Sequence, residues 1–218
     1  MDVFNAIVKF FQEGGVFMYP ILLVFALGAA IAIERYMYLT IAKQSNRSMW
    51  DKLTPLVKAN NYEQAMAISS RSKSEVGKIM SYGLSRLRMT KKREDIEIAM
   101  EEGLMEVIPR LEKRTHYLAT YANIATLLGL LGTIIGLIQA FTAVANANPA
   151  DKADLLSASI SVAMNTTAFG LIVAIPLLLM FTVLQTKTTE IVDSMEMATV
   201  KFLNSITESR KESARSAN

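Results

Sequence analysis

The chain has 218 residues, 51% of them hydrophobic and 20% charged, with a net charge of +3, no cysteine and a single histidine, His116. Disulfides and thiolate metal sites are therefore excluded, and one histidine cannot supply the paired imidazole ligands of a zinc site within one chain. Since the sequence also lacks phosphate-binding loops and the common hydrolase and metalloprotease motifs, we expect neither a cofactor nor enzymatic activity.

Three stretches of the sequence contain no charged residue: 16–33, 117–145 and 155–186. Each is long enough for a helix that crosses the hydrocarbon core of a bilayer, which takes about 20 residues. The first stretch has an alternative interpretation as a signal peptide, which is disfavoured by its length and by the lack of a small-residue cleavage site before Glu34. The sequence therefore predicts an all-α integral membrane protein with three transmembrane helices.

The basic residues are distributed very unevenly along the chain. All but two of the 23 Lys and Arg residues lie in 35–114 or after residue 186, and the exceptions are Lys9 and Lys152. Because cytoplasmic segments carry the excess of Lys and Arg, this pattern predicts an outer (periplasmic) N-terminus and a cytoplasmic C-terminus. The basic charge thus reflects membrane topology, and no nucleic-acid partner is expected.

The chain begins with an amphipathic segment, 1–15, which we expect to lie at the periplasmic membrane interface. Transmembrane helix 1 is expected over 16–39. Glu34 and Arg35 follow its charge-free run and mark the cytoplasmic boundary, or else contact a neighbouring subunit.

Residues 40–116 are predicted to form a cytoplasmic helical region. Its helices include 62–70 and 75–88, with breaks at Pro55, at Asn60 and Asn61, and across 69–74. Its basic side chains would be solvated or lie near anionic membrane lipids. Beyond Lys91 a helical stripe of apolar residues continues into the second span: Ile96, Met100, Leu104, Val107, Leu111 and Leu118. Since Pro109 would kink this helix without ending it, we expect one helix of about 50 residues, or about 75 Å.

Transmembrane helix 2, over 117–145, has one face of small and hydroxyl residues. Steps of three and four residues place the following on that face: Ala122, Thr126, Gly129, Thr133, Gly136 and Ala140. Gly132 and Gly136 also form a GxxxG pair, a motif that is weak by itself. A face of this kind could accommodate another helix or a file of water molecules.

Transmembrane helix 3, over 157–186, follows a short periplasmic loop, 146–156, and repeats this design. One face carries Ala163, Thr167, Gly170 and Ala174, with Asn165 and Thr166 beside it and Pro176 deeper in the span. An apolar stripe then continues into a cytoplasmic C-terminal helix and tail, 187–218: Leu184, Ile191, Met195, Phe202 and Ile206. After Glu208 we expect disorder.

The polar groups of spans two and three are the candidates for an ion pathway. Any one threonine commonly bonds a carbonyl of its own helix or packs against a neighbour. Thr133 and Thr167, however, lie on small-residue faces of two different helices and together predict the wall of a hydrophilic path. The predicted pathway residues are Thr133, Thr167, Asn165, Thr166 and Thr126, and the predicted helix-packing residues are Gly129, Gly132, Gly136, Gly170 and Pro176. Because hydroxyl groups do not titrate near neutral pH, a proton pathway would need a carboxylate from a second protein.

Two segments, LATYANIATLLGLLGTIIGLIQAF (118–141) and ISVAMNTTAFGLIVAIP (160–176), resemble the paired signatures of the MotA/TolQ/ExbB proton-channel family. The three spans resemble its ExbB/TolQ branch. The resemblance implies an inner-membrane pentamer whose second and third spans surround two copies of an ExbD/TolR-like protein with a membrane Asp. It also implies energy transfer through a TonB- or TolA-like protein, and it matches Thr133 and Thr167 to pore-facing threonines.

One position departs from the family pattern, because Val162 stands where ExbB and TolQ usually carry a Glu. Asn165 or Thr166 could replace part of its polar contact. The leading hypothesis is a stator subunit driven by the proton motive force that energises outer-membrane transport or another envelope process. The sequence alone does not distinguish H⁺ from Na⁺ as the ion. The alternative is a non-conducting oligomeric scaffold. A channel that opens without a partner is disfavoured, since no ring of charges marks a filter.

Overall fold

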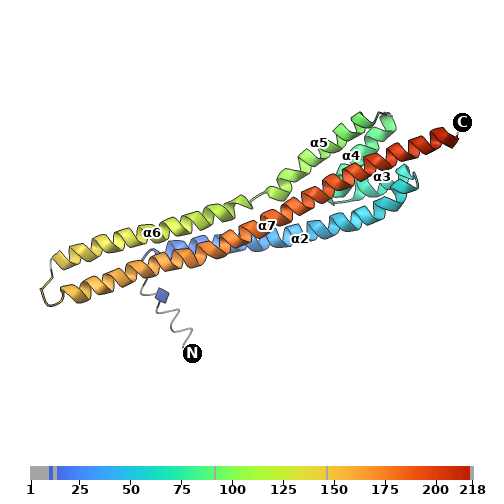
Figure 1. The fold of residues 1–218 in the computed structure, drawn as a ribbon. Helices are drawn as coiled ribbons and strands as arrows, with labels where there is room; N and C mark the ends of the chain where they lie inside the picture. The colour runs from blue at the N-terminus through green and yellow to red at the C-terminus, as the bar shows by residue number, and fades with distance from the viewer. Residues whose placement is uncertain (1–9, 12–13, 91, 146, 217–218) are drawn as a thin grey trace, which may run out of the picture. The chain divides into compact units, whose positions relative to one another are not determined.

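The structure is a computed structural model that describes residues 10–11, 14–90, 92–145 and 147–216. These residues are almost entirely helical, and no strand occurs among them. The helices are α2 (Met18–Lys58), α3 (Tyr62–Arg71), α4 (Glu75–Met89), α5 (Arg93–Glu112), α6 (His116–Ala145) and α7 (Lys152–Ser216) (Figure 1). Most of the predicted amphipathic segment 1–15 lies outside the described residues.

Three helical stretches of the described chain are long and apolar enough to cross a membrane: α2, the α5–α6 stretch and α7. Their apolar windows contain most of the exposed leucine, isoleucine and valine side chains, as expected for surfaces that face lipid rather than water. The chain is therefore an all-α multi-pass membrane protein, which confirms the predicted fold class.

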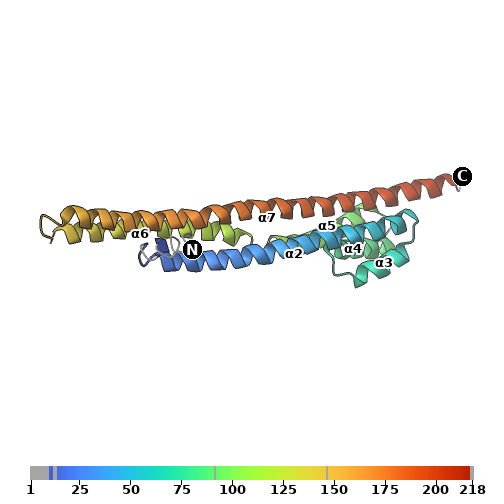
Figure 2. The same ribbon diagram turned by 90° about the horizontal axis from the view of Figure 1, so that it is seen from below.

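The chain divides into two compact units. Unit 1 comprises residues 1–35 and 114–183, and unit 2 comprises residues 36–113 and 184–218. Within unit 1, α6 and the first half of α7 run side by side in both views (Figures 1 and 2). Two small buried residues, Ala125 and Ala163, lie at their contact.

Unit 2 packs α3, α4 and α5 with the distal parts of α2 and α7. Its core contains fully buried side chains from each of the long helices, including Leu53 of α2, Met100 of α5 and Phe202 of α7. All five residues of the predicted apolar stripe from Leu184 to Ile206 are buried, which confirms that α7 continues past its membrane span as an amphipathic helix.

The short helices begin where the sequence predicts them. The side chain of Asn61 accepts a hydrogen bond from the amide of Gln64 (3.2 Å) at the start of α3, and that of Ser74 accepts one from Gly77 (3.1 Å) at the start of α4. Asn60, just before α3, has a φ of 56°, which ends α2 in the left-handed region that Asn tolerates better than most residues. The predicted helices 62–70 and 75–88 are confirmed.

Two predictions are wrong: the helix break at Pro55 and the disorder after Glu208. Pro55 lies inside α2, which continues to Lys58 because the buried side chains of Leu53 and Val57 hold the helix in place around it. The expected disorder after Glu208 is also wrong, since α7 continues to Ser216. Residues after Glu208 include good helix formers, and extending a helix already anchored by Phe202 and Ile206 has little entropic cost.

The predicted continuous helix through span two is wrong as well. α5 ends at Glu112, where the amide of Lys113 donates to the carbonyl of Pro109 (3.1 Å), and α6 begins at His116. Lys113 has φ −48° and ψ 132°, and Arg114 has φ 66°, values that match the central residues of a type II turn. The chain therefore leaves unit 2 and enters unit 1 through a turn rather than along a helix.

Candidate ion-pathway site

The contact between α6 and α7 is so close that their backbones touch. A Cβ atom on Gly170 would lie 2.7 Å from the carbonyl oxygen of Ala125 and 3.1 Å from the Cα of Gly129. A Cβ on Gly136 would lie 3.0 Å from that of Ala163, and one on Gly132 would collide with the side chain of Thr166. All four of these glycines thus lie where α6 meets α7, and small residues are what permit this approach in a membrane helix pair. Pro176, by contrast, is on an exposed face of α7.

Two threonines form a hydroxyl cluster at this contact. The Oγ1 atoms of Thr133 and Thr167 are hydrogen-bonded to each other. Thr133 Oγ1 also lies 3.2 Å from the carbonyl oxygens of both Gly129 and Ala163, and Thr167 Oγ1 lies 3.0 Å from that of Gly129. Each hydroxyl has one proton to donate and lone pairs to accept, so the cluster has more acceptors than donors and can take alternative hydrogen-bonded arrangements. We call Thr133, Thr167 and the Gly129 carbonyl the hydroxyl cluster.

The other predicted pathway residues do not join this cluster. Thr126 donates to the carbonyl of Ala122 (3.1 Å) in its own helix, which is the ordinary role of threonine in a membrane helix. Asn165 is half-buried and, two residues from Thr167, lies on another face of α7. Thr166 is only 2% exposed, and its hydroxyl lies 2.6 Å from the carbonyl of Gly14. The partner of Thr166 is 152 residues away in the sequence, and no spacing pattern could have indicated it.

The segment before α2 covers the same face of α7. Phe10 and Phe11 stack edge-on against Phe169, with ring centroids 6.3 and 5.8 Å apart. A Cβ on Gly15, whose φ is 74°, would lie 3.3 Å from the side chain of Val162. Val162, Thr166 and Phe169 follow steps of four and three along α7, so they share the face that receives this segment. The position that departs from the family pattern therefore lies close to Gly15, with 36% of the Val162 surface exposed.

The charged pair after span one has an unexpected partner. Glu34 Oε2 lies 3.0 Å from a guanidinium nitrogen of Arg114, the residue with positive φ in the turn before α6. Both side chains are about half exposed, so the ion pair contributes about 0–1 kcal/mol. Arg35 is buried, with 3% of its surface exposed. The sequence had indicated Glu34 and Arg35 but not Arg114.

The membrane-spanning parts of α6 and α7 contain no ionisable side chain that titrates near neutral pH. Neither 117–145 nor 155–186 contains Asp, Glu, Lys, Arg or His. Among the described residues no group of three or more His, Cys, Asp or Glu side chains could hold a metal ion. The site as it stands can donate and accept hydrogen bonds, but it cannot carry a proton as a charged side chain.

Residues 71–197, which include both threonines of the hydroxyl cluster, match the model of the MotA/TolQ/ExbB proton channel family. The chain belongs to this family. It is 28% identical over 199 residues to a biopolymer transport protein ExbB homolog of Methanothermobacter thermautotrophicus, over 90% of this chain and 69% of that protein.

Further relatives belong to the ExbB/TolQ branch. The biopolymer transport protein ExbB-like 1 of Synechocystis is 31% identical over 80% of this chain and 68% of its own length. The Tol-Pal system protein TolQ of Haemophilus influenzae is 37% identical over a shorter stretch, which is 36% of this chain and 34% of that protein. The chain is thus a membrane channel subunit of the ExbB/TolQ type.

Proposed function

We propose that this chain is the channel-forming subunit of a stator driven by the proton motive force in a bacterial inner membrane. Its N-terminus would be periplasmic and its C-terminus cytoplasmic, as the distribution of Lys and Arg favours. It would assemble as a homopentamer around two copies of an ExbD/TolR-like single-span protein and act on the outer membrane through a TonB- or TolA-like protein. It would catalyse no covalent reaction.

The observation that carries this proposal is a polar cluster without a titrating group. The hydroxyl cluster bridges two membrane helices, whereas the sequence of both spans lacks acidic and basic residues. Proton transfer across a membrane requires a group that changes its protonation state, so the carboxylate has to come from a partner helix. The hydroxyls would then accept that partner's carboxyl group, exchange hydrogen bonds with it and keep water in place as it passes.

The first test is assembly. The tagged chain is expressed with and without a genomic neighbour that encodes a single-span protein with an Asp early in its span, and native mass spectrometry counts the copies. Five copies of the chain with two of the partner are expected. A stable oligomer that never retains the partner would contradict the proposal and favour a non-conducting scaffold, in which the threonines only pack helices.

The second test separates chemistry from packing. Thr133→Val and Thr167→Val remove the hydroxyls at nearly constant volume, and Thr120→Val is the matched control, because the Thr120 hydroxyl bonds only the His116 carbonyl in its own helix (3.4 Å) among the contacts described. In proteoliposomes that contain both proteins, proton flux measured with a pH-sensitive dye should fall at least tenfold in the first two variants and change less than twofold in the control. Bulky replacements at either position, such as leucine, should block flux while the oligomer survives. Full flux in all variants would show that the hydroxyl cluster is not on the pathway.

A further inference from the structure

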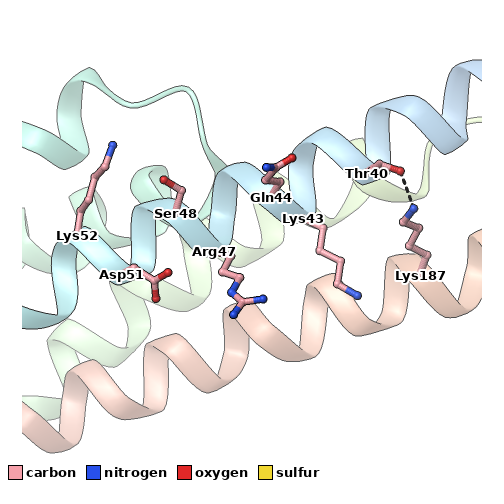
Figure 3. A pocket seen from close by; sticks show the side chains of 8 residues that line it. All are labelled: Thr40, Lys43, Gln44, Arg47, Ser48, Asp51, Lys52 and Lys187. Atoms are coloured by element: carbon pink, nitrogen blue, oxygen red, sulfur yellow. Dashed lines mark hydrogen bonds between the residues drawn. The ribbon is translucent and has the colours of Figure 1, made fainter.

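An open cavity of about 810 Å³ lies between α2 and α7 within unit 2. Figure 3 shows that Lys43 and Arg47 extend from α2 towards α7, and that Lys187 extends from α7 to Thr40. The Nζ atom of Lys187 lies 2.6 Å from Thr40 Oγ1 and 4.0 Å from the centre of the Tyr36 ring. Four of the eight residues that line this cavity are basic and one, Asp51, is acidic, so the cavity has a positive field.

A second, smaller cavity of about 200 Å³ adjoins the first, since Lys43 and Arg47 line both. Glu190 is at this junction and forms an ion pair with Lys43 at 2.6 Å. That hydrogen bond and charge lower the pKa of Glu190 below its usual value, which keeps the carboxylate ionised and orients the Lys43 ammonium. The guanidinium of Arg47, which lines both cavities, offers several donors to the shared space.

We call the cavity of about 810 Å³ the outer cavity and the one of about 200 Å³ the inner cavity. The inner cavity is also lined by a buried residue, Asn46, whose side-chain donor is unused. Asn46 is 3% exposed, and its Oδ1 accepts the amide of Val76 (3.1 Å) in the first turn of α4. This bond fixes which end of the side-chain amide is the oxygen. The Nδ2 group, at the other end, has no hydrogen-bond partner among the described residues. A buried amide without a partner is energetically unfavourable, and a bound acceptor would remove that cost.

The position of the cavities along the helices indicates where that acceptor comes from. Lys187 is the first charged residue after the charge-free run 155–186, and Thr40 lies seven residues beyond Ile33, or about 10 Å along α2. The mouth of the outer cavity, at Thr40 and Lys187, is therefore at the level of lipid headgroups. Asn46 and Arg47 lie about 10 Å further along α2 from Thr40, away from the membrane.

We propose that these two cavities bind the phosphate-bearing headgroup of an anionic lipid. The phosphate would lie between Lys43 and Arg47 and accept a hydrogen bond from Asn46 Nδ2, with Lys187 at the mouth, and would compete with Glu190 for Lys43. This inference does not depend on the proposed stator function, because it needs only the membrane boundary and the contacts within unit 2. It goes beyond general attraction of basic segments to anionic membranes, since it names one built site.

The experiment uses the full-length protein in zwitterionic detergent and its only tryptophan, Trp50, which lines the inner cavity. Short-chain phosphatidylglycerol is titrated while Trp50 emission is recorded, with short-chain phosphatidylcholine and inorganic phosphate as parallel arms. Saturable binding of phosphatidylglycerol at least tenfold tighter than of phosphatidylcholine is expected. Equal responses to both lipids would overturn the proposal, and tighter binding of inorganic phosphate than of phosphatidylglycerol would overturn the lipid source.

Three variants locate the site. Arg47→Gln should weaken phosphatidylglycerol binding about fivefold, the effect of one basic residue near an anionic surface, whereas Lys58→Gln on the same helix but outside both cavities should change it less than twofold. Asn46→Asp keeps the acceptor for the Val76 amide but replaces the donor by a carboxylate oxygen, so it should preserve helicity and weaken binding at least tenfold. Equal affinity in Arg47→Gln, Lys58→Gln and the parent protein would refute the assignment.

Discussion

The closest approach of α6 and α7 leads to a sharp prediction for Gly170→Ala. The added Cβ would lie 2.7 Å from the carbonyl oxygen of Ala125, about 0.5 Å inside an ordinary contact between carbon and oxygen. Both atoms belong to backbone within helices, so neither can rotate away, and the helices have to separate.

The expected magnitude follows from two opposing terms. Replacing glycine by alanine in a helix gains about 1 kcal/mol of backbone stability, whereas forcing a methyl group into a close contact costs about 1–3 kcal/mol. If the two helices separate by about 0.5 Å, the atoms along their contact also lose about a quarter of their dispersion energy. Gly170→Ala should therefore be less stable than the parent protein by up to about 2 kcal/mol.

Gly28→Ala is the matched control. Its Cβ would lie 2.7 Å from a terminal methyl of Leu177, the far end of a flexible side chain that can change rotamer. The control has the same backbone gain, so the two variants should differ by about 1–3 kcal/mol in the free energy of unfolding. The assay is unfolding in mixed micelles of increasing SDS fraction, followed by far-ultraviolet circular dichroism. Equal midpoints for the two variants would refute the claim that the backbones of α6 and α7 are in contact at Gly170.

Three other predictions follow from unit 2 and from the turn between the units. Arg114→Gly should be more stable than Arg114→Ala by about 1 kcal/mol in the same unfolding assay, because both lose the pair with Glu34 but only glycine adopts a φ of 66° without strain; the reverse order would refute that backbone conformation. Ser74→Ala should cost about 1 kcal/mol through loss of the cap at the Gly77 amide, whereas Ser70→Ala, whose hydroxyl bonds only a carbonyl of its own helix in the described contacts, should cost far less. The hydrogen bond to Glu106 raises the pKa of Tyr82 above its usual value of 10.0. The contribution of this hydrogen bond to stability is therefore complete below pH 10.0 and is lost as the pH rises through the higher pKa of the folded state. Glu106→Gln should therefore shift part of the tyrosine absorbance titration at 295 nm to lower pH, and an unchanged curve would contradict the contact.

Features that follow from side-chain periodicity were predictable from the sequence. The stripe from Leu184 to Ile206 recurs in helical steps, and burial of one helix face produces that recurrence wherever the partner lies. The Asn61 and Ser74 caps are equally local, since the capping atom and the amide it satisfies are three residues apart.

The failures concern features that the local pattern does not encode. Pro55 is a strong breaker in isolation, yet packing of its neighbours keeps it within α2. The residue with positive φ in the turn is Arg114, whereas Gly and Asn are the residues that usually adopt a positive φ. The sequence therefore did not predict this turn. In the site, the juxtaposition of Thr133 and Thr167 was predictable because each lies on the small-residue face of its helix. The contact of Thr166 with Gly14 was not, since it depends on how a distant segment returns to α7.

The hydroxyl cluster and the glycine contact are one structural feature. The carbonyl of Gly129 lies within hydrogen-bond distance of both threonine hydroxyls, and the Cα of the same residue is in contact distance of Gly170. The distance between the helices therefore also sets the distance from Thr167 to its acceptor on the opposite helix. Substitutions at Gly129 or Gly170 cannot distinguish a packing role from a role in ion transfer, because they alter both at once. Replacing threonine by valine leaves the glycine contact in place and removes only the hydroxyl, so it is the change whose effect on proton flux can be assigned to the chemistry of the cluster.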